Sequence, residues 1–264
     1  MAQDPAHETV EFNYSTYEKY YRQPLVELRY DLIYRQRRIA DLLDRAGIDP
    51  GRPGFAAFEY GFGAGHLLRV IANASRVVAM EFSPSAVEKG RRLAPEGHPS
   101  WEVRQHADAT DLPLESDSFD LVTASHVLEH LEQDDDVLDE FIRIVKPGGH
   151  LLIILPAHEQ LFTGTKHLRV YDVAEFTQRL RDRGLTEVIV DEHQRFDRPW
   201  KHHKVILQSR KNKLWKAAIE GSKAALFLPP LALTWKALAS VDAVLGRVGA
   251  KSTSVAYLFR KHKD

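Results

Sequence analysis

The chain has 264 residues, of which 44% are apolar and 28% charged, as expected of a globular protein long enough to bury a full core. It contains no cysteine, which excludes disulfides, thiolate metal sites and cysteine nucleophiles. The start of the chain, MAQDPAHETVEF, lacks a basic segment followed by an apolar one. We therefore expect no secretory signal and, by default, a cytoplasmic protein.

The net charge of −1 conceals an uneven distribution, because residues 198–264 carry 14 Lys and Arg against three acidic residues. Such a basic region attracts nucleic acid or anionic membrane surfaces, although lysines on solvated helices are the more common explanation. No recognisable nucleic-acid module accompanies it. We expect no nucleic-acid partner, and peripheral membrane contact stays open.

The first 54 residues predict two helices. Tyr17 and Tyr21 share one face of the first helix at i and i+4, and Pro24 separates it from a second helix that ends at Gly47. From Phe55 onward, short apolar runs alternate with helical patterns, which predicts a parallel sheet covered on both faces. The expected strands are 55–58, 76–82, 101–106, 119–124, 151–155, 186–190 and 255–259, and the expected helices in this part are 66–72, 84–93, 131–145 and 172–183.

Residues 59–65 read EYGFGAG and lie between the first strand and the next helix. Glycines in such a turn let the backbone tighten and let a ligand touch main-chain atoms. A dinucleotide fingerprint would need a glycine where this chain has His66, and no Gly-Lys-Ser or Gly-Lys-Thr closes the turn as in a P-loop. A glycine-rich turn can also serve only to pack a helix on a sheet, so the ligand has to be inferred from other residues.

Acidic residues close the first three strands, at Glu59, Glu81 and Asp108. A carboxylate at the end of the second strand can accept hydrogen bonds from both hydroxyls of a ribose. An aspartate at the end of the third strand can accept one from an adenine amino group. Each acid singly is more often a solvated strand end, but together they predict an adenosine pocket.

This pattern resembles the class I S-adenosylmethionine-dependent methyltransferases over about half of the chain, residues 55–184. The resemblance rests on EYGFGAG, on Glu81-Phe82-Ser83, and on segments 108–114, 118–122, 127–130 and 143–151. It implies S-adenosylmethionine as cofactor and a Rossmann-like α/β fold, a doubly wound sheet of seven strands in the order 3-2-1-4-5-7-6. The cofactor contacts that it implies are Glu59, Gly61, Gly63, Gly65, Glu81, Phe82, Asp108, Ala109, Ser125 and Tyr21.

For the acceptor side, the resemblance implies that His126 and His158, after the fourth and fifth strands, face the transferred methyl group. A histidine there could take a proton from a hydroxyl. The run His167-Leu168-Arg169-Val170-Tyr171 resembles methyltransferases of natural-product and cell-surface glycan pathways, which implies substrate contacts by His167 and Tyr171. N-terminal helices often form a lid in the family, which implies a substrate contact by Tyr17, although Tyr17 and Tyr21 could equally pack their helix on the core. The implied function is methyl transfer to a small-molecule acceptor. Oxygen is favoured as the methylated atom only because histidines abound and neither a cysteine nor a nucleic-acid module is present.

A metal site is a further hypothesis at His126, Glu129 and His130, which share one helical face at i, i+3 and i+4. The H-x-x-E-H spacing occurs in some zinc peptidases, and an E-x-x-E-H counterpart binds a divalent metal in some ubiquinone-pathway methyltransferases. The stretch VLEH is also frequent in the family without a metal. On balance the sequence predicts none.

We expect a single domain over residues 1–264: a helical lid (1–54), a cofactor-binding core (55–193), a basic helical insertion between strands six and seven (194–252) and a last strand (253–264). The apolar stretch 224–246 is interrupted by Pro229-Pro230, Lys236 and Asp242, so we expect no membrane span. We favour a cap over the acceptor pocket in which Trp235 packs against the fold. A dimer interface and a surface resting on anionic membrane are the alternatives.

Two other functions stay open. A non-catalytic scaffold that binds S-adenosylmethionine, including a membrane-associated one, would keep the same cofactor segments, and the acceptor pocket cannot be read from the sequence. An NAD-dependent oxidoreductase would use the glycine-rich turn alone, although His66 in place of the third glycine argues against it.

Overall fold

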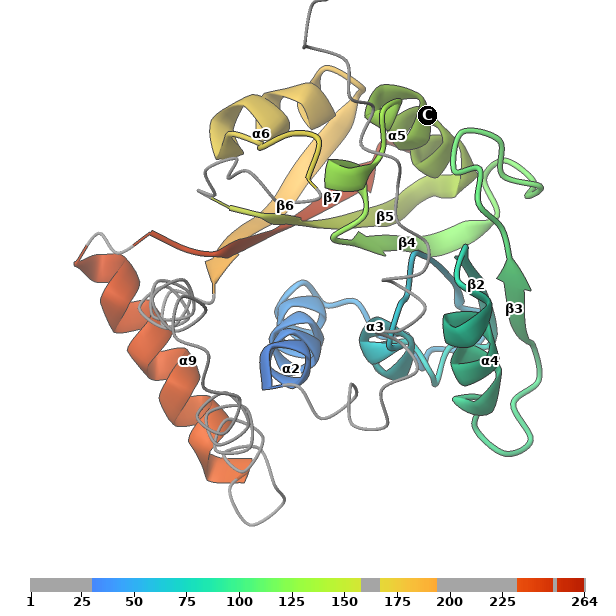
Figure 1. The fold of residues 1–264 in the computed structure, drawn as a ribbon, viewed down its shortest axis with the longest axis horizontal. Coiled ribbons are helices and arrows are strands. Elements are labelled where there is room, and N and C mark those ends of the chain that lie inside the picture. The colour runs from blue at the N-terminus through green and yellow to red at the C-terminus, as the bar shows by residue number, and fades with distance from the viewer. Residues whose placement is uncertain (1–29, 158–166, 194–231, 249–250, 264) are drawn as a thin grey trace, which may run out of the picture.

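The computed structural model describes residues 30–157, 167–193, 232–248 and 251–263. Its centre is a seven-stranded sheet in the order β3-β2-β1-β4-β5-β7-β6, which confirms the predicted fold class (Figure 1). The strands are β1 (Ala56–Tyr60), β2 (Arg76–Glu81), β3 (Trp101–Gln105), β4 (Phe119–Ser125), β5 (Val145–Pro156), β6 (Leu185–His193) and β7 (Ser254–Lys261).

The first five strands run parallel, and β7 runs antiparallel to both of its neighbours, β5 and β6. The carboxyl ends of β1, β2, β3, β4, β5 and β6 therefore meet at one edge of the sheet. In open α/β sheets this edge binds ligands, where the strand order reverses. Here the reversal falls between β1 and β4, because β2 and β3 extend the sheet on one side and β5 on the other.

Helices cover both faces of the sheet (Figure 1). One apolar cluster joins it to α2 (Tyr30–Arg45), α3 (His66–Val70) and α4 (Pro84–Arg92). The other joins it to α5 (Asp134–Ile144) and α6 (Val173–Arg181), beside the short 3-10 helix η2 (Leu128–His130). Alternate residues of a strand serve opposite faces, as Ala57 and Phe58 do in β1.

The elements begin and end close to the expected positions, and local sequence explains why. Ser83 caps α4, its Oγ accepting from the Ala86 backbone N–H, and Pro84 follows at the first helical position. Asp172 caps α6 in the same way. One difference is β5, which starts at Val145 rather than at residue 151. Val145 already pairs with Phe119, across an irregularity that precedes the regular β4–β5 register.

Several expectations fall on residues outside the described ranges. They include the first N-terminal helix with Tyr17 and Tyr21, His158, and residues 194–231 of the insertion. Helix α9 (Ala232–Arg247) is described beyond that gap and carries exposed Val241 and Val244. None of the helices in the described part is both long and apolar enough to cross a membrane. The side chain of Trp235 also lies outside what is described, so the cap stays a prediction.

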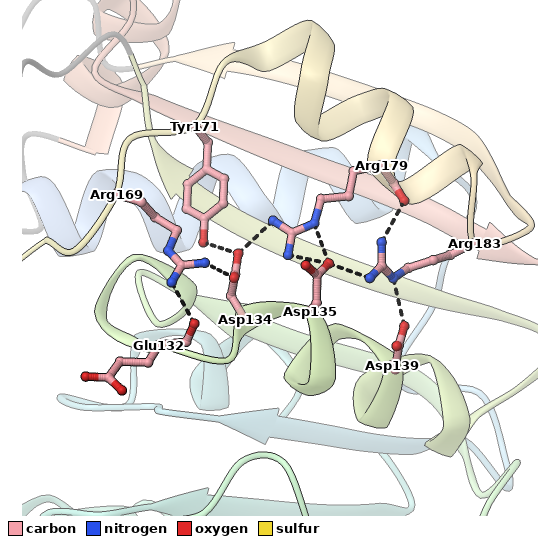
Figure 2. Close-up of polar contacts among 8 residues, drawn as sticks. All are labelled: Glu132, Asp134, Asp135, Asp139, Arg169, Tyr171, Arg179 and Arg183. Atoms are coloured by element: carbon pink, nitrogen blue, oxygen red, sulfur yellow. Dashed lines mark hydrogen bonds and ion pairs between the residues drawn. The ribbon is translucent and has the colours of Figure 1, made fainter.

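An ionic network fastens α6 to α5 (Figure 2). The buried Asp134 carboxylate accepts the Tyr171 hydroxyl at 2.8 Å and Arg179 Nη1 at 2.6 Å, and it also pairs with Arg169. Arg183, which follows the end of α6, donates to Asp135 and Asp139 of α5. The acids in the first turn of α5 also face the positive end of that helix.

A second buried pair links α2 to the edge strand β6. Arg38 donates to both oxygens of Asp191, at 2.9 and 2.6 Å, and His193 Nδ1 lies 3.3 Å from Asp191 Oδ2. Burial alone would raise the pKa of Asp191, but hydrogen bonds and charge from His193 and Arg38 hold it far below its usual range. This contact ties α2 to β6, while the apolar face of α2 packs in the same cluster as α3.

The network around Asp134 predicts a large stability loss for Asp134→Asn. The substitution keeps the shape but leaves two guanidinium groups facing a neutral amide. We expect the free energy of unfolding to fall by about 3 kcal/mol, the lower end for breaking a buried pair, because both arginines reach solvent. Asp136→Asn is the matched control, since Asp136 lies in the same first turn but is exposed. Urea unfolding of both variants measures the difference, and equal losses would contradict the role given to the buried network.

Candidate cofactor and acceptor site

The turn EYGFGAG lies between β1 and α3, as predicted. Gly61, Gly63 and Gly65 all have positive φ angles, of 68°, 52° and 76°. Two of them are also crowded: an added Cβ would lie 2.4 Å from Val127 at Gly61 and 2.2 Å from Leu93 at Gly65. The left-handed backbone favours glycine at all three positions, and close packing adds a second reason at Gly61 and Gly65. They form a tight loop of main chain at the carboxyl end of β1.

Glu81 ends β2 and is almost fully buried, at 1% exposure. Its Oε2 accepts from the Gly63 backbone N–H at 2.9 Å, and its Oε1 accepts from the Ser83 N–H at 3.1 Å. The carboxylate thus holds the glycine turn against the end of β2. A carboxylate has about four acceptor positions, two on each oxygen, and each of these bonds uses one position on a different oxygen.

Glu59 is the second buried acid of this edge, also at 1% exposure. Its Oε2 has no hydrogen-bond partner among the described residues. Burial first and the nearby charge of Glu81 second raise the pKa of Glu59 well above its usual value. A buried carboxyl group without a partner is a common feature of a site completed by a ligand, and a cationic ligand would favour its ionised form.

The predicted adenine side is more open. Asp108 is exposed, and its Oδ1 accepts from the Thr110 backbone N–H at 3.0 Å and from Thr110 Oγ1 at 2.6 Å. These bonds lower the pKa of Asp108. Ala109 is buried in the core, so only its main chain could reach a ligand. Phe82 is half-buried, and its carbonyl accepts from Gln105.

A strained residue follows β4. His126 has a φ of 56°, and its backbone N–H donates to the Ile154 carbonyl at 2.8 Å. Its Nδ1 lies 3.0 Å from Oε1 of Glu129, which is fully buried. The preceding Ser125 has a buried Oγ with no hydrogen-bond partner in the described part of the chain. Left-handed backbone at a non-glycine residue often marks a functional position.

The histidine and tyrosine of the 167–171 run lie beside η2 and α5. The His167 ring is 5.0 Å from the His130 ring, at an interplanar angle of 68°. Tyr171 is 8% exposed, packs on Phe176 and donates its hydroxyl to Asp134. Burial raises the pKa of Tyr171, so the hydroxyl keeps its proton. Its predicted contact with substrate is untested, and the hydroxyl already has a structural partner.

The structure thus groups most of the predicted residues at one edge of the sheet. Glu59, Glu81 and the glycines lie on the β1–β2 side, while Ser125 ends β4 and His126 follows it. Tyr17, Tyr21 and His158 fall outside the described residues. The structure adds Glu129, which the sequence considered only as a metal ligand. Its signal was the spacing of three residues from His126, which puts both side chains on one side of a turn.

Comparison with known proteins agrees with this fold. Residues 58–153 match the family model described as a methyltransferase domain. A demethylmenaquinone methyltransferase of Clavibacter sepedonicus is 45% identical over 83 residues, which are 31% of this chain and 33% of that protein. The ubiquinone/menaquinone biosynthesis C-methyltransferase UbiE of Vibrio campbellii is 31% identical over 108 residues, 39% of this chain and 42% of that protein. The chain therefore spans well under half the length of these relatives.

Among solved structures, a SAM-dependent methyltransferase from Aquifex aeolicus aligns with a TM-score of 0.51 and 22% identity, covering 69% of this chain and 93% of that one. At this identity the likeness shows the fold. Together with the sheet order and the glycine turn, it confirms the resemblance drawn from the sequence. Residues 58–153 belong to the methyltransferase-domain family, in a chain that has the fold of the class I S-adenosylmethionine-dependent methyltransferases.

Proposed function

We propose that the chain transfers the methyl group of S-adenosylmethionine to a hydroxyl oxygen of a small-molecule acceptor, with His126 as the proton acceptor. The observation that carries this proposal is the pair of His126 and the buried Glu129, 3.0 Å apart, directly after the central strand β4. A histidine held by a carboxylate is the usual arrangement of a general base.

The reaction needs little covalent help from the protein. A lone pair of the acceptor oxygen attacks the methyl carbon, the bond from carbon to sulfur breaks, and its electrons stay on sulfur to give S-adenosylhomocysteine. The hydroxyl proton passes to His126. With Nδ1–H donated to Glu129, the imidazole has the tautomer in which Nε2 is the basic nitrogen. The remaining work is positioning and exclusion of water.

The cofactor side is supported by the turn and the two buried glutamates. Main-chain atoms of Gly61 to Gly65 would lie along the methionine portion, and Glu81 would accept from the ribose hydroxyls. Glu59 offers a carboxylate to the cationic portion of the cofactor, where burial strengthens the attraction. The scaffold alternative shares all of these features and differs only in turnover.

A second candidate is methylation at a ring carbon of a phenol or quinol. It is favoured by the matched relatives, one of which is named as a C-methyltransferase. Deprotonation of a phenolic hydroxyl raises electron density on both the oxygen and the ring carbons, so the same base would serve either outcome. Product analysis distinguishes them, because an ether is formed in one case and a methylated ring in the other.

A labelled-methyl screen tests turnover. Wild-type protein is incubated with methyl-labelled S-adenosylmethionine and a panel of phenols, hydroquinones and sugars. For an acceptor that reacts, we expect His126→Ala to lower kcat by roughly 10²- to 10⁴-fold while cofactor affinity is unchanged. His262→Ala, an exposed histidine at the end of β7, is the control and should retain full activity. Transfer by His126→Ala at the wild-type rate would refute the proposed base, and no transfer to any acceptor would favour the scaffold.

Cofactor affinity tests Glu81. We expect Glu81→Ala to weaken binding of S-adenosylhomocysteine by roughly 10- to 150-fold for each charge-assisted hydrogen bond lost, or about 1.5–3 kcal/mol per bond. Glu88→Ala is the matched control, because Glu88 lies on neighbouring α4 but is exposed and pairs with Arg92. Calorimetric titration measures both. An unchanged dissociation constant for Glu81→Ala would mean that the carboxylate serves only the turn.

Glu59 makes cofactor binding depend on pH. Its raised pKa means that the free protein holds a proton there to higher pH than an ordinary glutamate does. A cationic cofactor favours the carboxylate, so binding should release this proton, and affinity should rise as pH rises through the pKa of Glu59. Calorimetry in two buffers of different ionisation enthalpy counts the released protons. Glu59→Gln should abolish the release and weaken binding by roughly 10-fold or more.

The same substitution should stabilise the free protein. The pKa of Glu59 is higher in the folded than in the unfolded state. At pH values between these two pKa values the folded state binds more protons than the unfolded state. The free energy of unfolding therefore falls as pH rises through this range. A neutral glutamine removes this loss. The Glu59→Gln variant should therefore have a higher melting temperature than wild type at neutral pH. In acid the two melting temperatures should be more nearly equal. A lower melting temperature at neutral pH would contradict the assigned cause.

A further inference from the structure

Three side chains converge beside the proposed base. Glu129 and His130 belong to η2, and His167 comes from the segment that follows β5. Each offers one ligand atom, an imidazole nitrogen or a carboxylate oxygen, and all three atoms lie within 4.8 Å of one another. Glu129 is fully buried and both histidines are half-buried, so the group is partly shielded from water.

The convergence is built into the backbone. The Leu168 backbone N–H donates to the Glu129 carbonyl at 2.7 Å, which fixes the residue next to His167 against η2. Arg169 adds a second tie, because its Nη2 donates to the Glu132 carbonyl at 2.7 Å and its guanidinium pairs with Asp134 (Figure 2). His167 is thus held beside His130 by contacts on the residues that follow it.

From this geometry we infer that Glu129, His130 and His167 form a binding site for a divalent transition-metal ion. Two imidazoles and one carboxylate are a ligand set for ions such as Zn²⁺, Co²⁺ or Mn²⁺, whereas Mg²⁺ and Ca²⁺ prefer oxygen ligands alone. Three protein ligands leave at least one coordination position for water or for an acceptor oxygen. The nearby Arg169 is neutralised by Asp134, so its charge does not oppose a cation strongly.

His126 has a supporting role in this site. Its Nδ1 contacts Oε1 of Glu129, and a carboxylate that binds a metal is usually held by such an outer hydrogen bond. The ligand set thus differs from the H-x-x-E-H hypothesis, in which His126 would itself bind the ion. This inference also revises the expectation that the chain binds no metal. The sequence did not reveal the pair, because His167 lies 37 residues from His130 and no local spacing links them.

Metal binding is tested without turnover. Full-length protein, stripped with chelator and freed of any affinity tag, is titrated calorimetrically with Zn²⁺, Co²⁺, Mn²⁺ and Mg²⁺. We expect one equivalent of Zn²⁺ to bind, Mn²⁺ and Co²⁺ to bind more weakly, and Mg²⁺ weakest. Bound Co²⁺ should also show visible absorption that reports nitrogen ligands. His130→Ala and His167→Ala should each weaken Zn²⁺ at least about 10- to 100-fold, since even the loss of an outer partner has that effect.

His262→Ala is the matched control and should bind Zn²⁺ as wild type does, because His262 is exposed and lies outside the group. Each variant is first shown to bind S-adenosylhomocysteine, and a variant that fails is replaced by the corresponding Gln substitution. The inference is overturned if wild type binds no Zn²⁺ or if His167→Ala binds it unchanged. It is equally overturned if Mg²⁺ binds as tightly as Zn²⁺.

Any effect of the bound ion on the acceptor would rest on the proposed function. Binding of the ion to the protein does not depend on that function. Wild type that binds Zn²⁺ and transfers no methyl group would refute the proposed function alone. Methyl transfer that is unchanged in chelator by a protein that binds no Zn²⁺ would refute the metal site alone. The two proposals therefore fail by different measurements.

Discussion

A buried carboxylate needs compensation for its lost hydration. The contacts that hold this fold together depend on how each buried acid obtains that compensation. An ionised carboxylate taken out of water is strongly disfavoured unless hydrogen bonds or opposite charges replace its hydration. Asp134 obtains two guanidinium groups and a phenol hydroxyl, and Glu81 obtains two backbone N–H groups. For Glu59, the Oε2 atom has no hydrogen-bond partner among the described residues, and the pKa of the group is raised. The compensated acids tie elements of the fold together, whereas burial of Glu59 raises its pKa instead.

Local pattern in the sequence was sufficient for the framework. The alternation of apolar runs with helical patterns predicted the strands from Phe55 onward, and EYGFGAG predicted the turn that carries three positive φ angles. The strand order came from the family resemblance, because alternation alone leaves the order open. What local pattern could not supply was compensation between distant residues. Glu81 bonds the glycine turn across 18 positions, and Tyr171 bonds Asp134 across 37.

Tyr171 and Arg169 illustrate the limit most clearly. The resemblance of the run from His167 to Tyr171 to natural-product and glycan-pathway methyltransferases implied that Tyr171 contacts the substrate. In the fold its hydroxyl lies on Asp134, where it completes the shell of a buried charge. Its contribution to acceptor binding would then be indirect, because the network fixes the segment that carries His167 against η2. The ionic network on α5 thus helps to hold the segment that begins at His167 against η2.

The family model matches only residues 58–153, and this limits which parts of the proposed site can be compared with the relatives. The family match spans 58–153, which holds the glycine turn, Glu81, Asp108 and the pair of His126 and Glu129. His167, the network partners on α6 and the whole of β7 lie beyond it. The residues that would select an acceptor come largely from the unmatched part, whereas the proposed base lies in the matched part. The proposed base His126 and the proposed metal ligand His167 therefore lie on different segments of the fold, and the family match covers only the segment with His126.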